Sequence, residues 1–292
     1  MMRAPSGWAV AVRNPGGDIE AVSHQLPRLS SRSKWARIPL VRGVLVLGES
    51  LTLGFRALAW SGQRSAGEDE EPVSTGQMAT SMTLAGVFFI AVFIVVPLLA
   101  ARWGGLDASS AWFHLVEAVV RIAMLVGYIW LIGRWEEIGR VFAYHGAEHM
   151  TIHAYEAGDP LDLDHIGTYR PEHPRCGTSF LLIVMLVAIV VFSLVGSLPW
   201  YWLIASRVVL IPLVAGLSYE ILKLGGSQVD RLVGRILTAP GLWLQRLTTR
   251  APEESMIEVA VVALLHALTD EEVGEVRARG PIVPEALAAY GR

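Results

Sequence analysis

Four long apolar stretches dominate the pattern of hydrophobic and polar positions along the chain. Residues 82–101, MTLAGVFFIAVFIVVPLLAA, carry no charge over about 20 positions, and a helix of that length spans the hydrocarbon core of a bilayer. Three further stretches have comparable length, namely 111–133, 178–195 and 200–222. We therefore expect a mainly α, polytopic membrane protein with about four transmembrane helices.

Shorter patterns precede these stretches. WAVAVR and IEAVSH, separated by the turn residues NPGGD, predict a β-hairpin within a cytoplasmic β element at residues 1–37. Residues 38–60 are apolar except for three charges at seven-residue spacing, Arg42, Glu49 and Arg56. This spacing favours a helix that lies in the interface or packs on the bundle, with a fifth span as the alternative.

The remaining segments complete the expected organisation. Residues 61–81 read as a polar, acidic linker, and residues 82–222 as a four-helix membrane domain that includes a His-rich loop at 134–177. Residues 223–292 form a C-terminal region in which EESMIEVAVVALLHALTD predicts an amphipathic helix. The Pro-Gly pair in LTAPGLWLQRLTT predicts a turn, after which Trp243 returns the chain to the interface.

The distribution of Lys and Arg predicts the orientation in the membrane. Residues 1–81 hold nine of these residues, the 134–177 loop four and residues 223–292 eight. The 102–110 loop holds one and the 196–199 loop none. Basic residues concentrate on the cytoplasmic side, so we expect a multi-pass protein of the inner (plasma) membrane with both termini and the His-rich loop in the cytoplasm.

Composition removes some function classes. The chain has 292 residues, a net charge of −3 and no dense basic run, which argues against a nucleic-acid partner. Its single cysteine, Cys176, excludes an intramolecular disulfide.

Charges within the apolar stretches suggest a buried network. Glu117 and Arg207 lie six and seven residues into stretches that run in the same direction, so we expect them at similar depth and paired, with Arg121 completing the network. Glu220, in the last stretch, is expected near the cytoplasmic surface, at the level of the His-rich loop. A structural role for this network is favoured over an ion path.

The string HGAEHMTIHAYE holds the main candidate chemistry. On a helix His145, Glu148 and His149 project together, and H-x-x-E-H is the pattern in which two histidines bind zinc and the glutamate is the general base. The alternative is ordinary surface histidines. A third ligand has to come from elsewhere, and we expect His173 or Glu220 to supply it. The other nearby candidates are His153, Glu156, His165 and Cys176.

A second string, RPEHPRCG, stands directly before an apolar stretch. Cys176 follows Arg175 at a predicted helix start, where a neighbouring positive charge and the helix dipole favour a thiolate. Cys176 is thus a candidate nucleophile or soft-metal ligand, with tight packing as the third interpretation, and Arg175 is a candidate catalytic residue. His153 ranks low because it lies two turns from His145, and His165 reads as a solvated loop residue.

Several strings resemble the YqhQ-like proteins, a bacterial membrane family containing a domain of unknown function. They are YHGAEHMTIHAYE, HPRCGTSF, RVVLIPLVAGLSYEILKL and PGLWLQRLTTRAPEESMIEVAVVAL, and the resemblance covers nearly the whole chain. It implies a metal-dependent enzyme. Family members typically carry a Gly-rich segment ahead of APSGWAVAVR, and we expect activity to depend on that segment if it contributes to the site. The resemblance singles out His145, Gly146, Glu148, His149, His173, Arg175, Cys176, Gly177 and Glu220.

Two functions follow as expectations. The first is a metal-dependent membrane enzyme, most simply a hydrolase, with a divalent ion (zinc, or else manganese or iron) at the cytoplasmic face. Its substrate would be a peptide, a lipid headgroup or a small metabolite, and it could act as a homo-oligomer. The second is a non-catalytic scaffold or regulator that docks a cytosolic partner, with structural His and Cys residues. A channel and a haem protein are less favoured.

Overall fold

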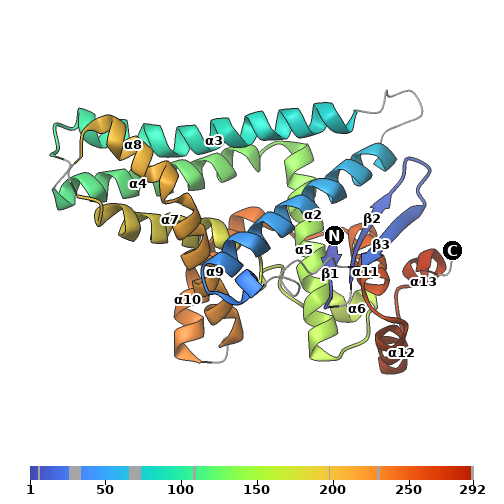
Figure 1. The fold of residues 1–292 in the computed structure, drawn as a ribbon. Coiled ribbons are helices and arrows are strands. Elements are labelled where there is room, and N and C mark those ends of the chain that lie inside the picture. Colours follow the sequence, from blue (N-terminus) through green and yellow to red (C-terminus); the bar gives the residue numbers. More distant parts are fainter. Residues whose placement is uncertain are drawn as a thin grey trace.

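The computed structural model is mainly helical, with a small sheet at one side (Figure 1). Its apolar helices form a bundle at one end, and the sheet and the C-terminal helices lie at the other. The described residues are 1–5, 7–25, 34–65, 74–107, 110–196, 198–228 and 231–290.

The sheet is an antiparallel meander at the N-terminus. Strands β1 (Met2–Arg3), β2 (Gly7–Arg13) and β3 (Ile19–Gln25) pair in sequence order. Gly17 has φ of 92° and closes the β2–β3 turn, a conformation that glycine adopts without a steric penalty. The predicted hairpin is confirmed, with β1 as a third, short strand. Within the predicted element, residues 26–33 lie outside the described residues.

Three helices in the described residues are long and apolar enough to cross a membrane. They belong to α2 (Val41–Ser65), α3 (Thr75–Trp103) and α4 (Ala111–Ile132). A fourth candidate is a bent pair, α8 (Trp200–Val209) and α9 (Ile211–Ser227), which meet at 45°.

Three to four candidates agree with the expected number of about four, but the segments differ from those expected. The 178–195 stretch forms α7 (Ser179–Ser193), whose 15 residues reach only ~22 Å, less than a bilayer core. The 200–222 stretch bends because Pro212, in the first turn of α9, lacks the N–H that would continue α8. Residues 38–60 lie mostly in α2, which has the length of a span, so their interfacial placement stays a prediction.

The predicted linker at 61–81 is shorter than expected. Helix α2 continues to Ser65, and α3 begins after Ser74, whose side chain forms a capping box with Gln77. The acidic residues 66–73 between them lie outside the described residues.

The predicted buried ion network is confirmed. Arg121 and Arg207 donate to the two carboxylate oxygens of Glu117 over 2.6 and 3.2 Å. All three side chains are at most 3% exposed. Arg207 also lies over the ring of Phe192, 4.5 Å from its centroid. One carboxylate thereby joins α4 to the bent pair α8–α9.

The C-terminal region differs from the sequence prediction in two ways. Helix α11 (Glu254–Ala267) is not amphipathic, because ten of its 14 residues are buried against the sheet, α5 (Glu136–Ala157) and α13 (Pro284–Tyr290). Pro240 lies inside α10 (Leu232–Thr248), so the predicted Pro-Gly turn is wrong. The other elements are η1 (Lys34–Arg37), α5 (Glu136–Ala157), α6 (Leu163–Ile166), α12 (Asp270–Arg279) and α13 (Pro284–Tyr290).

Candidate metal centre

Helix α5 occupies half of the predicted His-rich loop and carries His145 and His149 one turn apart on one face. The connection from α10 to α11 crosses this helix closely, and Arg250 donates its backbone N–H to Phe142 over 3.0 Å. A Cβ atom on Gly146 would collide with the Arg250 carbonyl oxygen. The glycine of HGAEH therefore lets the crossing segment approach the two histidines.

Both histidine rings are fixed by backbone carbonyls. His145 Nδ1 lies 2.9 Å from the Thr248 oxygen, and His149 Nδ1 lies 2.6 Å from the Pro171 oxygen. A carbonyl oxygen only accepts hydrogen bonds, so each Nδ1 carries a hydrogen and each Nε2 is left to bind a proton or a cation. A histidine ligand held by a carbonyl at its other nitrogen is typical of metal centres.

Cys176 lies against these rings. Its sulfur is 3.2 Å from His145 Nε2, and Thr178 contributes a backbone N–H at 3.3 Å and a hydroxyl at 3.0 Å. Burial would raise the pKa of the Cys176 thiol, but hydrogen bonds and charge interactions with His145 and His149 lower it to about 5. Burial opposes a raised pKa at His145, yet contact with the Cys176 sulfur raises it. The site stabilises a thiolate.

His145, His149 and Cys176 together fit a divalent metal. One ligand atom from each lies within 4.8 Å of the other two. Among the described residues, this is the group of three His, Cys, Asp or Glu side chains that could hold a metal ion. Imidazole nitrogen and thiolate sulfur are the ligands that zinc prefers. Three protein ligands leave one position of a tetrahedral ion open to a substrate, which is the arrangement of catalytic zinc sites.

His173 lies nearby but is not placed as a ligand. Its Nδ1 accepts the backbone N–H of Arg175 over 3.2 Å, so in the neutral ring Nε2 carries the hydrogen and has no lone pair to offer. That Nε2 faces Glu156 at 3.4 Å. Burial, followed by the neighbouring His153 and His149 rings, lowers the pKa of His173 to about 3.

Two other predicted residues are engaged elsewhere. Glu220 bonds Arg42 through both oxygens, at 2.5 and 3.2 Å, and does not join the ligand group. Helix α2 packs on α9 and supplies the arginine that pairs with Glu220, and the expected depth of Glu220 stays a prediction. Arg175 is exposed and pairs with Glu156 over 2.6 Å. The Cys176 thiolate is therefore favoured by His145, His149 and Thr178, not by Arg175.

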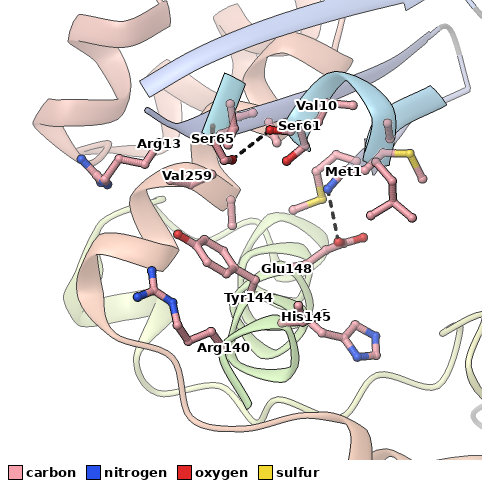
Figure 2. Close-up of a pocket in the computed structure, with 18 of the residues that line it drawn as sticks. Met1, Val10, Arg13, Ser61, Ser65, Arg140, Tyr144, His145, Glu148 and Val259 are labelled. Atoms are coloured by element: carbon pink, nitrogen blue, oxygen red, sulfur yellow. Dashed lines mark hydrogen bonds and ion pairs between the residues drawn. The ribbon is translucent and has the colours of Figure 1, made fainter. Parts of the chain in front are cut away.

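Glu148 projects from the adjacent face of α5, into a pocket of about 770 Å³ between β2, α2, α5 and α11. Its carboxylate lies 3.6 Å from the Met1 amino group, whereas the His145 ring points away from the pocket (Figure 2). His145 borders both the pocket and the ligand group, and the charge of Glu148 raises the pKa of its ring.

Gln245 is a site residue that the sequence did not reveal. It is fully buried, and its side chain pairs with the backbone of His173, accepting over 2.7 Å and donating over 2.9 Å, and also donates to Ser179. It holds the loop that carries Cys176. The sequence feature that could have indicated a buried role for Gln245 is its place among the apolar residues of GLWLQRL. The carbonyls of Thr248 and Pro171 have no side-chain signal at all.

The other two histidines of the predicted loop, His153 and His165, behave as expected. His153 Nε2 bonds the Glu172 carbonyl at 2.9 Å, and its ring stacks on Tyr169. His165 is exposed and pairs with Asp162 at 2.8 Å. Neither joins the ligand group.

The fold and the site define a mainly helical protein with apolar helices of membrane-spanning length and a His–His–Cys cluster beside them. The chain belongs to the family described as "Protein of unknown function (DUF1385)", whose model matches residues 38–270. It is 32% identical over 289 residues to the "Uncharacterized protein YqhQ" of Bacillus subtilis (strain 168), covering 92% of this chain and 89% of that protein. The resemblance to YqhQ-like proteins is confirmed. No solved structure matches.

Proposed function

We propose that this protein is a metal-dependent membrane enzyme, most simply a hydrolase, with zinc or another divalent ion held by His145, His149 and Cys176. The convergence of three ligand atoms within 4.8 Å carries the proposal. A bound ion of this kind polarises an ester, amide or phosphoryl oxygen and makes water a stronger acid.

Exposed aromatic residues support the membrane placement. The end of α3 and the starts of α4 and α8 gather at one end of the bundle (Figure 1), where Trp103, Trp112 and Trp200 are 88%, 67% and 58% exposed. Trp130, near the other end of α4, is 50% exposed and stands ~27 Å along the helix from Trp112. Tryptophan is enriched at both interfaces of a bilayer, and this separation matches a bilayer core.

The chain's own residues have distinct roles in this proposal. The carbonyls of Thr248 and Pro171 keep each Nε2 directed away from the backbone, and Gln245 fixes the loop that bears Cys176. Glu148 borders the pocket beside His145, and we assign it the role of general base toward water that enters there.

A hydrolysis screen tests the proposal. The zinc-loaded protein in proteoliposomes is given chromogenic esters, phosphoesters and peptides, alongside Glu148→Gln and Cys176→Ala. Turnover is expected in the wild type, with loss of rate but retention of metal in Glu148→Gln, and loss of both in Cys176→Ala. Equal rates in all three proteins contradict the assignment.

The second candidate is a non-catalytic scaffold with a structural cluster. The observation that favours it is the burial of Cys176, 7% exposed, within the network that Gln245 forms with His173 and Ser179. This candidate predicts that substitutions in the cluster lower the melting temperature of the protein, and that the hydrolysis screen finds no turnover in any protein.

A further inference from the structure

The pocket beside Glu148 has the lining of a site for an amphiphile. Its volume of about 770 Å³ lies within the range of small-ligand sites. Most of its exposed lining is apolar, contributed by a strand and by two helices that the ribbon shows around it (Figure 2). The apolar wall includes Val10, Val12, Ala57, Leu58, Val259 and Ala263.

The polar groups of the pocket are arranged asymmetrically. Arg140 and Tyr144 of α5 lie on one side in Figure 2, and Glu148 lies toward the other. Arg13, also on the lining, is committed to Glu258 over 2.5 Å. Arg140 is exposed and makes no ion pair with any described residue. The charge of Glu148 is offset by the Met1 amino group at 3.6 Å, whereas the charge of Arg140 has no such partner. An anionic group is therefore attracted to the Arg140 side of the pocket.

The apolar wall is continuous with the outer face of α2. Leu58 lines the pocket and is itself 58% exposed, and Leu51 and Phe55 on the same helix are 52% and 44% exposed. An exposed apolar face of this kind on a helix of α2's length is suited to contact with acyl chains. Leu58 therefore belongs both to the pocket lining and to this exposed apolar face.

We propose that this pocket binds a single-chain amphiphile with an anionic head, its tail against the apolar wall and its head beside Arg140. If this amphiphile is the substrate of the enzyme, the inference rests on the function proposed above, because His145 borders both the pocket and the ligand group. Binding of the amphiphile in the pocket does not depend on hydrolytic turnover and is tested separately.

Two glycines of α2 provide a matched pair of variants. A Cβ atom on Gly54 or on Gly48 would meet no heavy atom within 4 Å, so a side chain can begin at either position without a clash at Cβ. Gly54 lines the pocket and Gly48 does not. Both substitutions also raise helix propensity, so neither is expected to unfold α2. Gly54→Leu places a side chain in the pocket and narrows it, and Gly48→Leu reports the effect of a leucine elsewhere on the same helix.

The experiment is photolabelling of the full chain in nanodiscs with a diazirine-bearing dodecanoic acid, with labelled peptides identified by mass spectrometry. We expect label on β2 and α11 in the wild type and in Gly48→Leu, competition by dodecanoate, and about tenfold less label there in Gly54→Leu. Arg140→Gln is expected to weaken competition by dodecanoate by about 1.5-fold to fivefold, the range for an exposed charge pair.

Equal labelling of β2 and α11 in the two leucine variants overturns the inference. So does stronger competition by dodecyltrimethylammonium than by dodecanoate, because the charge preference would then follow Glu148. Pocket labelling in a protein without hydrolytic turnover removes the proposed function and leaves the binding site. Turnover in a protein with no pocket label removes the binding site and leaves the function.

Discussion

The Nε2 atom of His145 lies 3.2 Å from the sulfur of Cys176, although the two residues stand 31 positions apart in the sequence. The contact joins α5 to the turn that begins α7, and Gln245 of α10 fixes that turn from behind. His145 and Cys176 share a hydrogen bond at this distance, and together with His149 they supply the three ligand atoms of the proposed metal centre.

The first prediction concerns the thiol in metal-free protein. Because the pKa of Cys176 is about 5, its thiolate is already formed above pH 6.5, and the rate of iodoacetamide labelling should be nearly constant from about pH 6.5 to 9. The rate should fall as the pH drops through 5. In His145→Asn the lost hydrogen bond raises the pKa, so the rate should climb with pH.

Intact mass measures this labelling cleanly, since Cys176 is the single cysteine of the chain. Cys176→Ser should give no adduct. A wild-type rate that rises tenfold per pH unit up to pH 8 would show an ordinary thiol and contradict the His–Cys interaction.

The sequence predicted the parts of the site that depend on helical spacing. His145 and His149 share a face because four residues make about one turn. The contact of Glu117 with Arg207 was expected because each residue lies a similar number of positions into its apolar stretch. Spacing does not report which loop closes on a helix. The atom that converges with the two imidazoles is accordingly the Cys176 sulfur, whereas sequence reasoning ranked Cys176 behind His173 and Glu220 as the third ligand.

Backbone groups and helix environment account for the other differences. The carbonyls that orient the rings have no side-chain signature, and Arg42 captures Glu220 through a long-range packing of α2 on α9. The apolar run of helix α11 is too long to lie on one helix face. The sheet, α5 and α13 bury the helix on several sides, which explains the run. The apolar run itself was the signal for a buried helix.

The second prediction concerns Gly146. Its replacement by alanine places a methyl group against the Arg250 carbonyl oxygen, which must shift together with the adjoining Thr249 and Thr248. We expect a loss of about 1–3 kcal/mol of stability and weaker metal binding. Gly127→Ala is the matched control, because a Cβ there meets nothing within 4 Å. Equal melting temperatures for the two variants in detergent would contradict the close crossing.

The third prediction concerns the buried ion network. Glu117→Gln leaves the guanidinium groups of Arg121 and Arg207 without a counter-charge, and we expect a cost of about 3–5 kcal/mol. The control is Glu20→Gln, which removes a partly exposed pair with Arg64 and should cost less than about 1 kcal/mol. Unfolding free energies measured in mixed micelles test the difference. Similar costs for the two variants would refute the network's burial.

The fourth prediction concerns acid stability. His173 takes up a proton near its ordinary pKa of 6.5 when unfolded, but only near 3 when folded. Between these values the unfolded state binds more protons, so stability should fall as the pH falls, by up to about 1.4 kcal/mol per unit.

The asparagine oxygen in His173→Asn can still accept the Arg175 N–H. The loss of stability on acidification that comes from His173 should therefore be absent in this variant. The acid midpoint of unfolding, followed by tryptophan fluorescence, measures the effect. A midpoint unchanged from the wild type, with equal stability at pH 7.5, would show that folding does not lower the pKa of His173.

The most direct test of the account is the metal content of the purified full chain. Mass spectrometry of protein prepared without chelator should find about one zinc, manganese or iron per chain. The metal should be retained in His165→Ala, which changes an exposed histidine outside the cluster, and lost in the His145→Ala/His149→Ala double variant of equal foldedness. No metal in the wild type, or equal metal in all three proteins, would contradict the metal centre.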